Sequence, residues 1–192
     1  MAKAGQRRFA LGVDYGTNSV RALVVDVADG SEVAAGLFDY PSGDAGILLD
    51  PKDPNLARQN PADYIEGFYK SVRSALRAAK KLPDFAPGSL VGIGVDTTGS
   101  TPMPVDHAGT PLAMRPGFAN DLAAQAWLWK DHTGHAEAAE ITEAARKDGT
   151  GYLAKCGGTY SSEWFWSKIL HCKRAAPKVF EAAHAWVELA DF

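Results

Sequence analysis

The chain has 192 residues, of which 46% are hydrophobic and 22% charged, and its formal net charge is −3. This is ordinary for a folded protein, and long enough for one domain with a substantial core or one domain and part of a second. The slightly acidic balance argues against a nucleic-acid-binding domain, which is usually basic. No run of about 18 apolar residues is present. No apolar run precedes the first predicted strand, so we expect neither a membrane span nor a secretory signal.

Cysteine and histidine usage gives no sign of a disulfide or a zinc site. Cys156 and Cys172 do not form a disulfide framework that spacing could predict, and we expect two reduced thiols in a cytoplasmic protein. His132 and His135 are three residues apart, but no further ligand completes a zinc-binding set.

The first part of the chain predicts three consecutive antiparallel strands. Short apolar runs at 9–13, 20–27 and 32–40 are bounded by Gly, Asp or Ser, and Asp29-Gly30 is a strong hairpin signal. The segment 41–60 contains three prolines and no clear periodicity, so we expect a long loop there.

A helix is predicted after this loop, with Asn60 as its N-cap and Pro61 at its first position. Its apolar residues recur at helical spacing, and Pro83 marks the stop. The run 90–95 is almost wholly apolar or glycine, as expected of a strand buried on both faces. The strand–helix–strand order predicts that this strand runs parallel to its neighbour. A fifth strand is expected at 102–105.

The rest of the chain predicts helices at 121–130, 136–147, 163–174 and 177–184, with Ser161 or Ser162 as the cap of the third. The whole order predicts an α/β fold. Its mixed sheet with flanking helices would occupy about 9–105, and a mostly helical insertion about 115–185. The apolar end at 186–192 has no polar tail, and we expect the natural protein to continue beyond it.

The sharpest chemical signal lies between the first two strands. Glycine lets a backbone approach a phosphate closely, and neighbouring hydroxyl and amide side chains add donors. An Asp at a strand end suits Mg²⁺, directly or through water, and an Arg neutralises phosphate charge. These residue types suit phosphoryl transfer, although a plain hairpin explains the spacing equally well. Neither a P-loop nor a dinucleotide-binding glycine motif is present. The residues that carry the hypothesis are Asp14, Gly16, Thr17, Asn18, Ser19 and Arg21.

The segment 14–21, DYGTNSVR, resembles the first phosphate motif of the FGGY carbohydrate kinases, in the actin, Hsp70 and hexokinase superfamily. The predicted element order is similar to the ribonuclease-H-like core of that superfamily. Residues 59–64 and 91–102 resemble the start of the family's first long helix and its fourth strand with the following loop. Residues 128–133, LWKDHT, and 157–166, GGTYSSEWFW, resemble the L-ribulokinase branch in particular. The resemblance covers about residues 9–192.

The resemblance implies phosphorylation of L-ribulose to L-ribulose 5-phosphate, with ATP and Mg²⁺ as cofactors. It implies that Asp14 organises the metal ion and the phosphates, and that the turn around Gly16 contacts ATP. In the family the general base, the second phosphate loop and the adenosine site belong to a second domain, so we expect this chain to be inactive alone. The residues that the resemblance places at the sugar are Asp96, Gly99, Trp129, Asp131 and Tyr160.

Several alternatives remain open. The substrate could be another pentulose or a polyol, the chain could be a non-catalytic binding or regulatory module, or the protein could be an actin-like or Hsp70-like ATPase. Asp96 is explained equally well as a turn residue. Trp127, Trp164 and Trp166 are explained better as packing residues than as walls of a ligand site. We expect no nucleic-acid or membrane partner, and an open cleft face would favour association of copies.

Overall fold

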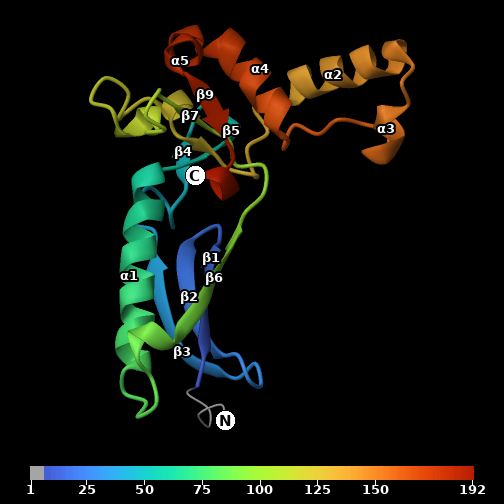
Figure 1. Cartoon of the computed structure of the whole chain (residues 1–192). Helices are drawn as coiled ribbons and strands as arrows, with labels where there is room; N and C mark the ends of the chain where they lie inside the picture. Colours follow the sequence, from blue (N-terminus) through green and yellow to red (C-terminus); the bar gives the residue numbers. More distant parts are fainter. Residues whose placement is uncertain (1–6) are drawn as a thin grey trace. The chain divides into compact units, whose positions relative to one another are not determined.

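The computed structural model describes residues 7–192, which divide into two compact units (Figure 1). Unit 1 extends to Gly46 and resumes at Ala62–Thr97, whereas unit 2 contains Ile47–Pro61 and Thr98–Phe192. The division differs from the predicted one, because the main sheet ends at Thr97 and residues 47–61 belong to the other unit.

Unit 1 contains a four-stranded mixed sheet in the order β3-β2-β1-β6 (Figure 1). Its strands are β1 (Phe9–Tyr15), β2 (Ser19–Asp26), β3 (Glu32–Asp39) and β6 (Leu90–Thr97). The first three pair antiparallel in sequence order, and β6 pairs parallel with β1. Both predictions are therefore confirmed.

Helix α1 (Pro61–Ala79) begins at the predicted proline and lies against one face of this sheet. Two glycines allow the close approach: a Cβ at Gly36 would lie 2.1 Å from the Ser71 carbonyl oxygen, and one at Gly67 would lie 2.4 Å from Val20 Cγ2. The core of unit 1 forms between helix and sheet. Its buried apolar members include Leu11, Val13, Val20, Val24, Tyr64, Ala75 and Ala79.

The prediction that the fourth strand is buried on both faces is wrong. Val91, Ile93 and Val95 of β6 are 56%, 64% and 60% exposed. Ile93 and Val95 pair with the buried Leu11 and Val13 of β1, so they occupy the α1 face of the sheet. Their apolar character specifies a strand, but α1 lies over the neighbouring strands and leaves them uncovered.

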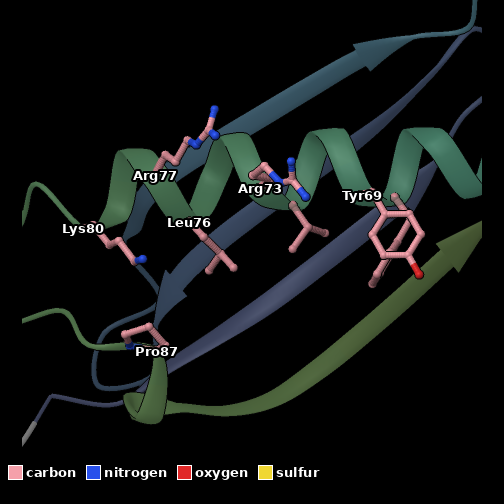
Figure 2. A pocket seen from close by; sticks show the side chains of 8 residues that line it. Tyr69, Arg73, Leu76, Arg77, Lys80 and Pro87 are labelled. Carbon is pink, nitrogen blue, oxygen red and sulfur yellow. The ribbon is translucent and has the colours of Figure 1, made fainter.

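A hollow of about 420 Å³ runs beside α1 (Figure 2). Phe68, Val72 and Leu76, which define the predicted apolar face of the helix, are only half-buried because they line this hollow. The fully buried face of α1 is instead rotated toward Ser71 and Ala75. The basic side chains at its rim are Arg73, Arg77 and Lys80.

Unit 2 contains two small sheets. One pairs β4 (Leu48–Asp50), β5 (Asp53–Gln59) and β8 (Ala126–Trp127), and the other pairs β7 (Met103–Val105) with β9 (Ala185–Val187). The loop predicted at 41–60 is wrong, because it contains the β4–β5 hairpin. The helix predicted at 121–130 is also wrong, because it is a short 3₁₀ turn followed by β8. The strand predicted at 102–105 forms, but outside the main sheet.

The helices of unit 2 are α2 (His135–Asp148), α3 (Tyr152–Lys155), α4 (Phe165–Ala175) and α5 (Pro177–Ala182). Three of them match predictions to within two residues at each end, and α3 was not predicted. The predicted serine cap of α4 is wrong, because its N-cap is Trp164 and no side chain caps it. No helix in the described part of the chain is long and apolar enough to cross a membrane.

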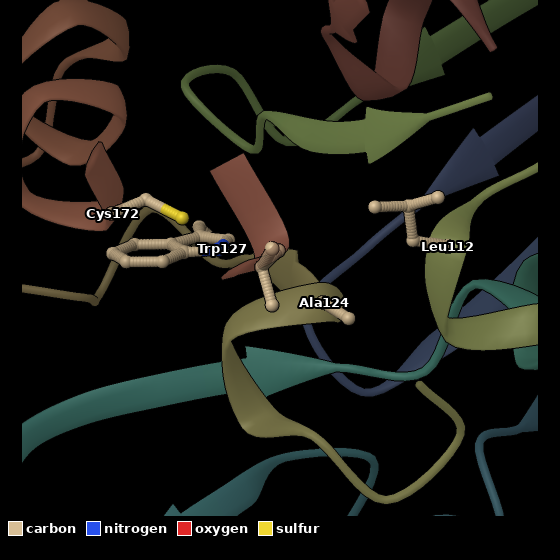
Figure 3. Close-up of a cluster of buried hydrophobic side chains, with 5 residues drawn as sticks. Leu112, Ala124, Trp127 and Cys172 are labelled. Atoms are coloured by element: carbon tan, nitrogen blue, oxygen red, sulfur yellow. The ribbon is translucent and has the colours of Figure 1, made fainter. Parts of the chain in front are cut away.

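Trp127 lies at the centre of the unit 2 core (Figure 3). It is 1% exposed, and its indole N–H donates to the Ala123 carbonyl oxygen at 2.9 Å. The packing role predicted for Trp127 is confirmed, whereas Trp166 is 63% exposed and does not pack in the core of unit 2. Burial raises the pKa of the Cys172 thiol to about 12. Both cysteines are free thiols, as predicted. The rest of the cluster is Leu112, Ala124, Cys172 and Val179.

Candidate functional site

The face of the unit 1 sheet opposite α1 brings three charged side chains together. Asp14 on β1 pairs with Asp96 on β6 and with Arg21 on β2. Paired residues on neighbouring strands share a face, with the strands about 5 Å apart. Because Val13 points toward α1, Asp14 points to the open side, and all three charged residues are exposed. Two of them were predicted at the phosphates and Asp96 at the sugar.

A hollow of about 460 Å³ lies at these residues. Gly12 and Gly94, also paired across β1 and β6, form part of its lining. A Cβ at Gly94 would meet nothing within 4 Å, and one at Gly12 would meet only the Leu23 carbonyl oxygen at 4.0 Å. The absence of side chains at these two positions leaves the backbone open to a ligand.

The turn between β1 and β2 is held by a hydrogen bond of its own and by two bonds to residues after β3. The Gly16 N–H donates to the Ser19 carbonyl oxygen at 2.9 Å, and the Tyr40 N–H donates to the Asn18 carbonyl oxygen at 2.9 Å. The Asn18 side-chain amide donates to the Ala45 carbonyl oxygen at 2.7 Å. Two of the predicted phosphate donors, the Gly16 N–H and the Asn18 amide, are therefore engaged within the chain. Thr17 and Ser19 are half-buried in the same turn.

The carboxylates in this hollow fit a magnesium ion. Mg²⁺ is usually held by one or two protein carboxylates, with phosphate oxygens and waters completing the octahedron. Asp14 and Asp96 offer two exposed carboxylates at adjacent positions, although Asp96 Oδ1 also accepts from the Thr97 N–H at 3.0 Å. Within residues 7–192 no group of three or more His, Cys, Asp or Glu side chains could hold a metal. A magnesium ion here would therefore need ligand or water oxygens as well.

In unit 2, Trp129 follows β8 and is 36% exposed, with the Lys130 ammonium 5.5 Å from its ring centroid. Asp131, predicted at the sugar, is fully buried. Its carboxylate accepts from the Ala57 N–H at 2.8 Å and from the Thr133 hydroxyl at 2.6 Å. It also forms an ion pair with Arg58. The Asp131 carboxylate is thus occupied in holding this segment to β5.

Arg58 is the buried cation of that pair. Its guanidinium carbon lies 3.3 Å from the Trp127 ring centroid, and its Nε donates to the Leu122 carbonyl oxygen at 3.2 Å. Burial lowers the pKa of Arg58, but direct contact with the Asp131 carboxylate keeps the guanidinium charged. Both strand β5 and the 127–133 segment are anchored by this one cation.

Tyr160 and Gly99 are the remaining predicted sugar residues. The Tyr160 hydroxyl accepts a hydrogen bond from the backbone N–H of Trp166 at 3.1 Å. The backbone N–H of Tyr160 donates to the Thr142 hydroxyl at 2.9 Å, and the Tyr160 ring packs edge-on against Trp164 with a centroid distance of 5.0 Å. Burial raises the pKa of Tyr160. Tyr160 therefore supports the first turn of α4. Gly99 is exposed, and a Cβ there would meet nothing within 4 Å.

Residues 9–192 match the family model described as "FGGY family of carbohydrate kinases, N-terminal domain". The chain belongs to the FGGY family of carbohydrate kinases. The match covers both units, so the open face of the unit 1 sheet and the Trp129 segment are parts of one family domain. The resemblance found at the phosphate turn is confirmed at the level of the family.

Several carbohydrate kinases are similar to this chain in sequence or in structure. A ribulokinase from Vibrio parahaemolyticus is 39% identical over 187 residues, which cover 97% of this chain and 32% of the relative. A ribulokinase from Shouchella clausii is 37% identical over 193 residues, covering 97% and 33%. A solved xylulose kinase from Bifidobacterium adolescentis has a TM-score of 0.68 at 16% identity, covering 95% and 32%, and confirms the predicted fold class. The chain spans about a third of the length of these relatives.

Two side chains in this FGGY domain lie near the predicted sugar residues and were missed by the sequence analysis. Glu188 accepts from the Thr101 N–H at 2.8 Å, and burial raises its pKa. Lys168 on α4 is fully buried. Burial, with the charge of Arg58 acting in the same direction, lowers the pKa of Lys168 to about 7. Helical spacing gave a signal for Lys168, because it lies four residues from Trp164 and from Cys172, on the buried face of α4.

Proposed function

We propose that this chain supplies the N-terminal part of an ATP-dependent ribulokinase that converts L-ribulose to L-ribulose 5-phosphate. The observation that carries the proposal is the set of Asp14, Asp96 and Arg21 at paired positions on the open sheet face. The choice of sugar is supported by the ribulokinases of 37% and 39% identity. Because the chain spans about a third of their length, the activity is that of the longer protein.

Unit 1 serves the nucleotide end of the reaction in this proposal. Asp14 holds Mg²⁺ beside the ATP phosphates, and the Arg21 guanidinium neutralises part of their charge. Bound Mg²⁺ neutralises the charge that develops on the transferred phosphoryl group. The turn at Gly16–Ser19 approaches the phosphates closely because its backbone is already fixed by the Gly16–Ser19 hydrogen bond.

Unit 2 serves the sugar. The exposed ring of Trp129 offers an apolar surface to the C–H face of a sugar, and the bare backbone at Gly99 leaves room for it. Tyr160 contributes its ring edge. Asp131 acts on the sugar through the backbone that carries Trp129, since its own carboxylate is buried and engaged.

The test is Asp14→Asn in the full-length protein. We expect the rate of L-ribulose phosphorylation to fall by about 10²- to 10⁴-fold, since a carboxylate that organises the metal and phosphates becomes neutral. Thermal stability should stay unchanged because Asp14 is exposed. Asp84→Asn, another exposed carboxylate of unit 1, is the matched control and should keep full activity.

Retained activity in Asp14→Asn would contradict the proposed role of the open sheet face. Faster turnover on xylulose or ribitol than on L-ribulose would change the proposed substrate but would still support a sugar kinase. The 192-residue chain by itself should give no measurable turnover, and robust turnover by it would contradict the assignment of essential groups to the rest of the relatives' length.

A further inference from the structure

A lysine side chain lies in the interior of unit 2, and no carboxylate within residues 7–192 is in hydrogen-bond contact with it. Lys168 is 0% exposed and is among the largest fully buried side chains of the described chain. A buried ammonium is unfavourable unless its protons are satisfied. Burial and the charge of Arg58 lower the pKa of Lys168 to about 7, so the ammonium form depends on contacts that stabilise it.

Its ammonium binds three backbone carbonyl oxygens. The distances from Nζ are 2.6 Å to Ser100, 2.8 Å to Leu128 and 3.3 Å to Trp127. An ammonium has three N–H donors, so this set accounts for all of them. No proton is left to act on a ligand, which excludes Lys168 as a group that touches the substrate in this arrangement.

The carbonyls belong to two chain segments that are distant in sequence. Ser100 lies in the loop after β6, 68 residues from Lys168, and Leu128 lies 40 residues from it. Ser100 also has a φ of 56°, a backbone conformation that residues other than glycine rarely adopt. Such a conformation persists where surrounding contacts over-determine it, and the short bond to Lys168 is one of them.

Two of the three bound carbonyls, those of Ser100 and Leu128, directly adjoin a residue of the proposed sugar site. Gly99 precedes Ser100, and Trp129 follows Leu128. The Thr101 N–H is held at the same time by Glu188 at 2.8 Å, so both polar groups of the peptide unit between Ser100 and Thr101 are fixed. One ammonium thus sets the position of the 98–101 loop relative to the 127–129 segment within unit 2.

We propose that Lys168 is a positioning residue for the sugar: its buried ammonium fixes Gly99 and Trp129 relative to each other before a polyhydroxylated ligand binds. Pre-set geometry of this kind lowers the ordering cost of binding. The inference rests on the proposed function, because it takes these two residues as sugar contacts. A purely structural role would predict only a loss of stability when Lys168 is replaced. A positioning role also predicts a specific loss of affinity for the sugar.

The test is Lys168→Met in the full-length protein, with Lys173→Met on the same helix as the exposed control. We expect the KM for L-ribulose to rise about 10- to 100-fold, with the KM for ATP changed by less than about twofold. Amide hydrogen exchange without sugar should accelerate at 98–101 and 127–131 and stay unchanged in the β1–β3 strands. Lys168→Gln, which keeps two donors, should give an intermediate rise in KM.

The outcomes separate this inference from the proposed function. If wild-type protein binds no L-ribulose, the proposed function fails, whereas the exchange measurement still reports whether Lys168 holds the two segments. Normal L-ribulose KM in folded Lys168→Met overturns the inference and leaves the kinase intact. Equal increases in the KM values of sugar and ATP, or failure of both Lys168 variants to fold, also overturn it, because Lys168 would then support the fold in general.

Discussion

The β1–β2 turn of unit 1 and the 127–133 segment of unit 2 are held in place by different means. The turn is held by three uncharged hydrogen bonds, one from Gly16 to Ser19 and two that join Asn18 to Tyr40 and to Ala45. The segment is held by the buried pair of Arg58 and Asp131 and by Lys168, with Ala57 bonded to Asp131 across 74 residues. Proposed contacts to the phosphates thus depend on uncharged hydrogen bonds of the β1–β2 turn and the segment after β3, and those to the sugar on buried charges that join distant parts of the sequence.

From this comparison we expect the largest loss of folding free energy when Arg58 is replaced. Arg58→Met leaves the Asp131 carboxylate buried without its cation, and such a change typically costs about 3–5 kcal/mol of folding free energy. Urea unfolding of the variant, followed by tryptophan fluorescence, measures it. Glu143→Gln, which removes an exposed pair with Arg146, is the control and should change stability by no more than about 0.5 kcal/mol. Equal losses in the two variants would show that burial does not distinguish the pairs.

A second pair of variants compares two glycines of the unit 1 sheet. Gly36→Ala brings a Cβ to 2.1 Å from the Ser71 carbonyl oxygen, so helix and sheet must separate. We expect a loss of about 1–3 kcal/mol in thermal or urea unfolding. Gly94→Ala meets no atom within 4 Å and should leave stability almost unchanged. Its methyl group enters the hollow beside Asp14, and we expect a higher KM for ATP. Equal stability of both variants would contradict the close packing of α1 on β3.

The two regions also differ in how far the sequence predicted them. The β1–β3 meander, α1 and the parallel β6 follow from local apolar runs, an Asp-Gly turn and proline at a helix start, because these elements are specified by neighbouring residues. Strand β8 has two residues and exists because Arg58 and Gln59 pair with Trp127 and Ala126. A pairing over such a sequence distance leaves no periodicity to detect, so 121–130 was predicted wrongly. The β4–β5 hairpin within 41–60 is local, but the three prolines of that segment hid it.

The candidate site, too, could be predicted only in part from the sequence. Asp14 and Asp96 were both named from the sequence, and their adjacency followed once β6 was known to run parallel to β1. The engagement of Asp131 by Arg58 could not be predicted, since nothing in the residues around Asp131 points to β5. Lys168 carried a helical-spacing signal, but only the structure shows which carbonyls it reaches.

A third comparison uses paired positions on β1 and β6. Val13 is 2% exposed and Val95, its partner in register, is 60% exposed. Val13→Ala should destabilise the protein by about 2 kcal/mol through lost burial and a residual cavity, and Val95→Ala by less than about 0.5 kcal/mol. Urea unfolding of both variants in the full-length protein measures the difference. A loss at Val95 as large as that at Val13 would show that the exposed face of β6 is covered in the longer protein.

The smallest expected effect concerns the ion pair of Asp26 with Arg7, whose Nε donates at 2.7 Å to the carboxylate while the Ala28 N–H donates at 2.9 Å. The Ala28 N–H and the Arg7 side chain lower the pKa of Asp26 below its ordinary value of 3.8. The folded state therefore binds this proton less tightly than the unfolded chain, so the pair stabilises the fold above about pH 4 and loses its contribution as pH falls through the folded pKa.

Asp26→Asn should accordingly lower the melting temperature at pH 7, and its difference from wild type should shrink as pH falls through the folded pKa of Asp26, where the carboxyl group becomes neutral. Thermal unfolding of the two proteins across this range measures the gap. Because the Arg7 side chain is 40% exposed, the difference in melting temperature between Asp26→Asn and wild type should also shrink in 1 M salt. The loss of stability in Arg58→Met should not, because the Arg58 and Asp131 side chains are 2% and 0% exposed. A difference in melting temperature that does not shrink as pH falls below about 4 would mean that Asp26 acts through packing and not through its charge.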